Sequence, residues 1–181
     1  MFAVFKNQKG VTLVETMVAI AVLTIGVLAA LGMQIQTVGS SSSAMNRTGA
    51  NSVALSLLEN LKSLSFDDPN LVQTTATAVE LDNIRTSGEL QLLIDAAKVR
   101  TFTAAQFPEM QFLIQMPPGG VAGDIVDRSD IFYHLAWDVK DRTLATGEML
   151  NKTIRVFMIW DSPMGPAKLE MTTIKYNNIS L

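Results

Sequence analysis

One carboxylate stands inside the longest apolar run of this sequence. Residues 11–33 hold a single charged side chain, that of Glu15. A charged Glu costs about 2 to 3 kcal/mol near the centre of a hydrocarbon layer, so a residue of this kind ordinarily has a partner. The chemistry to be explained is therefore an acid in an apolar segment and the group that neutralises it.

The apolar run predicts a membrane-spanning helix, because about 20 apolar residues at 1.5 Å each cross a hydrocarbon core of about 30 Å. Lys6 and Lys9 precede the run, and residues 1–10 contain no acid. This asymmetry predicts a cytoplasmic N-terminus and an outward C-terminal domain. The ordinary interpretations are a signal anchor or a secretory signal cleaved near residues 30–32. The second is disfavoured because the run is long for a signal peptide and Glu15 interrupts it.

The segment KGVTLVE, residues 9–15, resembles the cleavage motif of type IV prepilins and their pseudopilin relatives. The resemblance implies that a prepilin peptidase cuts between Gly10 and Val11 on the cytoplasmic side. It also implies that Val11 is then N-methylated and that Glu15 is retained in the membrane. The family most often has Phe or Met as the first mature residue, where this chain has Val11.

Cleavage at this point would supply a partner for the acid. The new α-amine of Val11 lies about one helical turn before Glu15. In a staggered filament the Glu15 carboxylate would meet the Val11 amine of a neighbouring subunit. Opposite charges attract strongly in a low dielectric, where either charge alone is penalised, so the pair would set the register between subunits. The plainer alternative is an acid tolerated near a helix end.

The helix is expected to continue to about residue 63. Residues 31–64 lack Pro, and apolar or small residues recur at steps of three and four, which is typical of an amphipathic helix. The sequence DDPN at residues 67–70 predicts its end. Gly39 and the serines at 40–43 are weak helix formers. They indicate either a flexible joint or a segment that bends when the subunit leaves the bilayer.

The expected organisation has four parts. They are a leader peptide (1–10), a transmembrane and assembly helix (11–33), an amphipathic continuation of that helix (34–64), and a periplasmic or extracellular pilin-like globular domain (65–181).

Three alternating segments predict an antiparallel β-meander. They are residues 131–140, 153–161 and 169–176, and one face is expected to pack on the long helix. The predicted fold class is α+β, a long N-terminal helix on a meander, the arrangement of pilin headgroups.

The chain before the meander gives weaker signals. Residues 71–87 are expected to form a loop with at most short elements, residues 89–99 a short helix and residues 110–116 a strand.

The C-terminal strands extend the resemblance. The segments around Trp137 and Trp160, followed by Thr-Thr-Ile at 172–174, resemble PilV-type minor pilins. This implies a minor pilin, incorporated by packing of its N-terminal helix, that primes or modifies assembly of a type IV pilus. The implied partners are prepilin peptidase, other pilin subunits, the inner-membrane assembly machinery and, before assembly, membrane lipid. The implied location is the inner membrane and then the pilus.

Three acids in a Gly-bounded stretch, Asp124, Asp127 and Asp130, are weak candidates for a calcium site. No EF-hand pattern accompanies them, so a solvated turn is the plainer interpretation, and neither a metal nor a cofactor is expected. His134 is the only histidine and is expected at the surface of its strand. Trp137 and Trp160 are expected in the core, with an exposed docking surface as the alternative.

Catalysis is not expected, because the chain has no Cys, one His and no nucleophile–base pair. Three other functions stay open: a minor pseudopilin of a type II secretion system, a filament-tip adhesin or DNA-uptake subunit, and an anchored domain outside any filament. The net charge of the mature chain argues against a nucleic-acid-binding function. Loss of Lys6 and Lys9 from the 14 basic residues leaves 12 against 17 acidic ones, a net charge of −5.

Overall fold

The computed structural model describes residues 12–102, 114–115, 117, 120–127, 130–145, 147–162 and 165–177. Contacts within the chain define two compact units, Met1–Ser41 and Ser42–Leu181.

Helix α1 runs over Leu13–Ser63, which confirms the expected long helix. It is continuous through Gly39 and Ser40, where the Ser40 hydroxyl donates to the Gln36 carbonyl at 3.0 Å. No described residue before Ser42 is buried. The buried side chains of α1 all come later: Asn46, Ala50, Val53, Ala54, Leu57, Leu58 and Leu61.

The second unit is built on one antiparallel sheet. Its strands are β1 (Arg100–Thr101), β2 (Ile114–Gln115), β3 (Asp124–Asp127), β4 (Phe132–Thr143), β5 (Met149–Ser162) and β6 (Gly165–Tyr176). The order is β2-β3-β4-β5-β6, and β1 pairs with β4. The predicted meander is confirmed in β4, β5 and β6. Of the predicted strand at 110–116, residues 114–115 form β2, whereas 110–113 and 116 lie outside the described residues.

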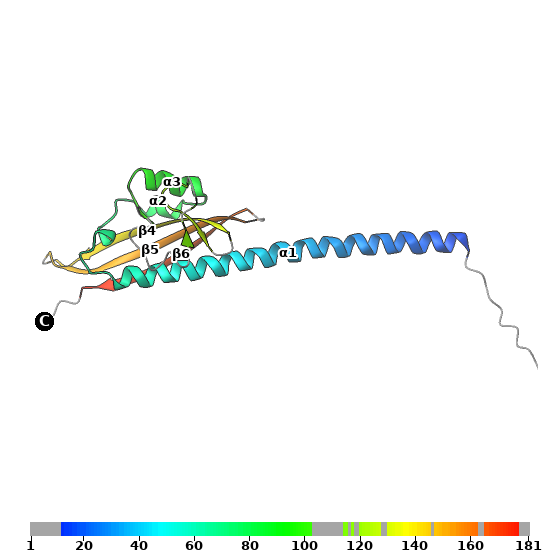
Figure 1. Ribbon diagram of the computed structural model, residues 1–181, viewed down its shortest axis with the longest axis horizontal. Coiled ribbons are helices and arrows are strands. Elements are labelled where there is room, and N and C mark those ends of the chain that lie inside the picture. The colour runs from blue at the N-terminus through cyan, green and yellow to red at the C-terminus, as the bar shows by residue number, and fades with distance from the viewer. Residues whose placement is uncertain are drawn as a thin grey trace, which may run out of the picture. The chain divides into compact units, whose positions relative to one another are not determined.

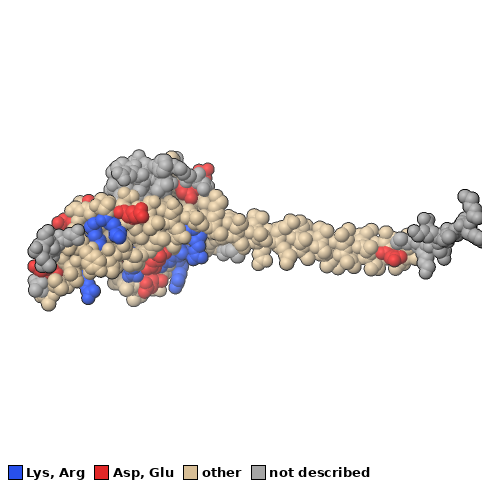
Figure 2. All heavy atoms as spheres, turned by 90° about the horizontal axis from the view of Figure 1, so that it is seen from below, with Lys and Arg blue, Asp and Glu red and all other residues tan. Residues whose placement is uncertain are grey.

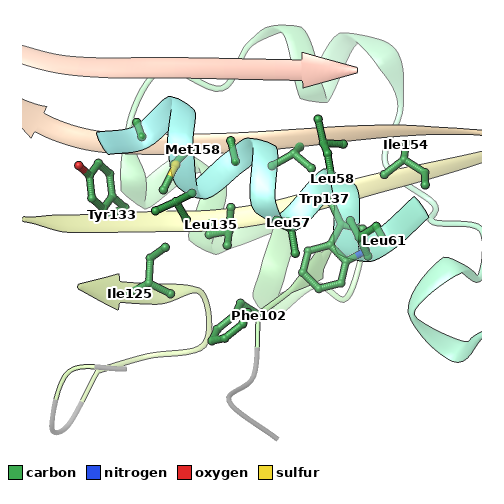
Figure 3. Packing of buried hydrophobic residues seen from close by; sticks show 14 of the residues in the cluster. Leu57, Leu58, Leu61, Phe102, Ile125, Tyr133, Leu135, Trp137, Ile154 and Met158 are labelled. Carbon is green, nitrogen blue, oxygen red and sulfur yellow. The ribbon is translucent and has the colours of Figure 1, made fainter. Parts of the chain in front are cut away.

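One face of the sheet packs on the later turns of α1. The alternating side chains of β4 and β5 lie on this face as predicted. They are Tyr133, Leu135, Trp137 and Val139 of β4, with Ile154, Val156, Met158 and Trp160 of β5. Figure 3 shows Leu57, Leu58 and Leu61 of α1 gathered with the strand residues Tyr133, Leu135, Trp137, Ile154 and Met158. Burial of each large apolar side chain contributes about 1.5–3 kcal/mol, so this cluster is the main stabilising element of the unit.

The opposite face of the sheet is also covered, which the sequence analysis did not predict. Helices α2 (Ala78–Asp82) and α3 (Ser87–Asp95) lie on it, on the side away from α1 (Figure 1). Each short helix begins with a capping box, Thr77 with Glu80 and Thr86 with Glu89. The second core contains Ala76, Leu81, Ile84, Leu90, Ile94 and Val99 with Ala136, Phe157 and Ile159 of the strands.

Hydrogen bonds hold the segment between α1 and α2 against the sheet. The Trp137 Nε1–H donates to the Asn70 carbonyl at 3.0 Å, and the buried Lys152 Nζ donates to the Leu71 carbonyl at 2.8 Å. Thr74 donates its hydroxyl to the buried Asp138 carboxylate, and its backbone N–H donates to the Val139 carbonyl at 2.9 Å. These contacts hold the segment that leads to the second core.

Candidate functional site

The start of α1 is set by Thr12. The Thr12 hydroxyl oxygen accepts a hydrogen bond from the Glu15 backbone N–H at 3.3 Å. This satisfies one of the free N–H groups of the first helical turn. It also places Glu15 in that turn, where the helix dipole favours a negative charge. The Thr-x-x-Glu spacing is a recognisable helix-start signal that the sequence analysis overlooked.

The predicted processing residues border this helix start. Gly10 and Val11 lie outside the described residues, so their geometry relative to Glu15 is not described. Among the described residues, no hydrogen bond or ion pair engages the Glu15 carboxylate. The pairing of Glu15 with the α-amine of Val11 therefore stays a prediction.

The helix beyond Glu15 carries a long uncharged surface, which is mostly apolar as far as Met33. Residues 16–46 contain no Asp, Glu, Lys or Arg, and Figure 2 shows this length of helix without basic or acidic atoms. Its large side chains are exposed, among them Met17, Leu23 and Leu28. By length and composition α1 is the one helix in the described part of the chain that could cross a membrane, with a window of mean hydropathy 2.3. An apolar surface of this extent requires lipid or other helices around it.

Residues 5–31 match the family model of the prokaryotic N-terminal methylation motif. This motif indicates a type IV pilin or pseudopilin-like protein. The matched range contains Gly10, Val11 and Glu15, and it implies processing by prepilin peptidase and assembly with other pilins. The apolar helix fits the membrane anchoring typical of such proteins. Searches of curated proteins and of solved structures each gave no significant match.

Two of the three acidic candidates, Asp124 and Asp127, do not lie in the predicted solvated turn. Asp124 and Asp127 belong to strand β3, which pairs with β4. The Asp124 Oδ1 lies 2.6 Å from Nδ1 of His134, and both side chains are partly buried. His134 is therefore engaged by a neighbouring strand and is no isolated surface imidazole.

Asp127 is also occupied by a contact within the fold. Its Oδ2 accepts the Tyr133 hydroxyl at 3.1 Å, and its Oδ1 accepts the Ile131 N–H at 3.1 Å. Burial, and then the charge of Asp127, raise the pKa of Tyr133, so its phenol stays protonated and donates.

The third acid, Asp130, is exposed and has a positive φ of 57°. Among the described residues, no group of three or more His, Asp or Glu side chains has an arrangement suited to a metal ion.

Both tryptophans lie in the core, as predicted. Trp137 is fully buried and Trp160 is 2% exposed. The ring of Trp160 meets that of Tyr133 edge-to-face, with 5.9 Å between the ring centroids. Neither ring offers an exposed docking surface.

Proposed function

We propose that this chain is a minor pilin of a type IV pilus, incorporated by packing of the N-terminal half of α1 against other subunits. The observation that carries this proposal is the match of residues 5–31 to the methylation motif, on a helix whose apolar side chains are exposed. Within a single chain these apolar side chains have no apolar surroundings. Lipid provides such surroundings before assembly, and neighbouring helices provide them in a filament.

In this proposal Glu15 carries the assembly specificity. Prepilin peptidase cleaves between Gly10 and Val11, and the exposed α-amine of Val11 is methylated. Glu15 of one subunit then pairs with the amine of its neighbour. Each charge is penalised alone in an apolar layer, so subunits in the matching register are favoured over other registers.

The proposed topology follows from the same segment. The chain sits in the inner membrane with its N-terminus cytoplasmic and the unit Ser42–Leu181 in the periplasm, and it moves to the cell surface with the pilus. We propose a structural role and no catalysis. The resemblance of the C-terminal strands to PilV-type minor pilins supports a low-copy subunit that primes or modifies assembly.

The deciding experiment is mass spectrometry of the mature protein from cells that make prepilin peptidase. The expected N-terminus is N-methylated Val11. Replacement of Gly10 by a bulky residue, Gly10→Leu, should leave residues 1–10 attached. A mature chain that starts at Met1 or Met33 would remove the basis of the proposal.

The alternative is a minor pseudopilin of a type II secretion system, because the methylation motif is shared by both groups. Deletion of the gene separates the two. A loss of surface pili with normal protein secretion supports the minor pilin, whereas a secretion defect with normal pili supports the pseudopilin. Quantitative mass spectrometry of sheared pili then tests copy number, which should be far below that of the main subunit.

A further inference from the structure

A small cavity lies between α1 and the strands β5 and β6, wholly within the unit Ser42–Leu181. Its volume is about 240 Å³, and it is lined by Ser43, Arg47, Trp160, Ser162, Ala167 and Lys168. Ser43 and Arg47 are four residues apart on α1, so they share one helix face. Trp160 and Ala167 are direct partners across β5 and β6. Regular elements therefore hold the lining residues in place.

Two hydrogen-bond donors at this cavity are buried without a partner. Trp160 is 2% exposed, and its Nε1 makes no hydrogen bond with any described residue. The Ser43 hydroxyl is likewise buried and unpaired within the described part of the chain. A buried donor left unsatisfied costs about 1–3 kcal/mol. The indole of Trp137, by contrast, donates to the Asn70 carbonyl.

The charge at the cavity is positive. Arg47 is exposed, and no ion pair or hydrogen bond to another described residue holds its guanidinium. No Asp or Glu is among the lining residues.

Lys168 adds no charge to the cavity, because its ammonium serves the other face of the sheet. There it lies 3.2 Å from the Leu81 carbonyl oxygen, 3.4 Å from Oε2 of Glu170 and 5.1 Å from the centre of the Phe157 ring.

We propose that this cavity binds a carboxylate group. Guanidinium recognises a carboxylate through paired, charge-assisted hydrogen bonds. The indole N–H and the Ser43 hydroxyl supply the two further donors. A pocket for a drug-sized ligand is about 300–1,000 Å³, so this cavity suits a short acid or the side chain of Glu or Asp. The two sources, a free small carboxylate and an acidic side chain of another protein chain, share this chemistry.

The test uses the indole resonances of the full chain in an uncharged detergent. The protein contains two tryptophans, so ¹⁵N-indole labelling gives one signal for the site and one internal reference. Sodium acetate is titrated against sodium chloride at constant ionic strength. The Trp160 signal should shift and saturate with acetate, whereas the Trp137 signal should stay in place because its N–H is already bonded to Asn70.

Variants of exposed arginines give the matched comparison. Arg47→Gln removes the proposed charge and should weaken acetate binding at least about tenfold. Arg142→Gln removes an exposed arginine at the end of β4 and should bind as the unchanged protein does. An unmoved Trp137 signal in each variant shows that the core is intact.

The source of the carboxylate is distinguished by a second titrant, N-acetylglutamate methylamide, which presents a Glu side chain with flanking peptide groups. Binding tighter than acetate assigns the site to a side chain of another protein. Equal binding assigns it to a free acid. The proposal is overturned if Trp160 shows no saturable shift, if chloride shifts it equally, or if Arg47→Gln binds acetate as the unchanged protein does.

Discussion

At the scale of single residues, Glu15 has two roles that can be separated. It lies in the first turn of α1 near the cap formed by Thr12, and in the proposed filament it pairs with Val11 of a neighbour. Glu15→Val should enter the membrane as well as the unchanged chain or better, because it removes a charge from the apolar run, yet it should fail to enter filaments. Immunoblots of the membrane fraction measure insertion, and immunoblots of the sheared-pilus fraction measure entry into filaments.

The matched control is Thr12→Val, which removes the cap and leaves the charge. It should cost about 1 kcal/mol of helix stability and still permit assembly. Normal assembly of Glu15→Val would show that the charge pair is not needed. Equal failure of both variants would assign the defect to the start of the helix.

Gly49 permits a close approach between α1 and the sheet. A Cβ at this position would lie 2.9 Å from the Tyr133 hydroxyl and 3.0 Å from Oδ2 of Asp127. Gly49→Ala gains about 1 kcal/mol of helix propensity. It also displaces a buried hydroxyl that bonds to Asp127 and to the Asn46 carbonyl, and each buried group left unsatisfied costs about 1–3 kcal/mol. We expect a net loss of about 1 kcal/mol or more in denaturant unfolding.

Gly88 in α3 is the control for that substitution, because a Cβ there meets nothing within 4 Å. Gly88→Ala should be neutral or stabilising by up to about 1 kcal/mol. A stabilising effect of Gly49→Ala equal to that of Gly88→Ala would show that the contact between α1 and Tyr133 is not tight.

At the scale of elements, α2 is held by one acid. Glu80 forms an ion pair with Lys98 and accepts the Thr77 N–H at 2.8 Å. The hydrogen bond from Lys98, followed by those from Thr77, lowers the pKa of Glu80 from 4.5 to about 2. Because the pKa of Glu80 is lower in the folded state, the ionised carboxylate stabilises the fold. This stabilisation is complete above pH 4.5 and is lost as the pH falls towards 2.

Thermal unfolding of Glu80→Gln across this pH range tests the link between α2 and Lys98. The variant should unfold at a lower temperature than the unchanged protein at neutral pH, and the difference should shrink as the pH falls below 4.5. Glu148→Gln changes an exposed acid outside α2. Its unfolding temperature should equal that of the unchanged protein at every pH. A difference for Glu80→Gln that stays constant with pH would rule out the proposed electrostatic origin.

The elements differ in how far the sequence predicts them. Helix α1 and strands β4 to β6 were predictable because their periodicity is long and each has a clear break after it. The alternation of the strands predicts only one buried face, so it does not predict the second core. The run Val156–Trp160 is apolar at every position, which indicates burial on both faces. The acids of β3 predict a solvated turn, but His134 and Tyr133 are the partners of Asp124 and Asp127 within the sheet.

The candidate site was predictable in part for a similar reason. Gly10, Val11 and Glu15 are a local pattern, and the motif match covers all of them. The carboxylate cavity brings Ser43 and Arg47 of α1 to Trp160 of β5. Residues so far apart in the chain meet only through the packing of α1 on the sheet, and no local spacing signals that meeting. The sequence also contains the Thr12-x-x-Glu15 helix-start signal, which lies at the edge of the apolar run.

At the scale of the whole molecule, the two units should differ in what they need in order to be stable. All buried residues of the described chain lie within Ser42–Leu181. No described residue before Ser42 is buried, and residues 16–33 are almost all apolar. The fold of the second unit therefore rests on contacts within itself, whereas the first unit depends on lipid or on other helices. A chain that begins at Ser42 should fold in water without detergent and should show the near-ultraviolet circular dichroism of packed Trp137 and Trp160.

Its unfolding temperature should match that of the full chain in an uncharged detergent, because residues 12–41 add no buried contact to either core. A shorter chain that begins at Leu57 is the contrast. It lacks Ala50, Val53 and Ala54 of the first core, so it exposes one face of the sheet and should aggregate or remain unfolded. If the chain from Ser42 also failed to fold, the apolar first part of α1 would have to act in folding as well as in assembly, and Glu15 would then lie in a segment that serves both.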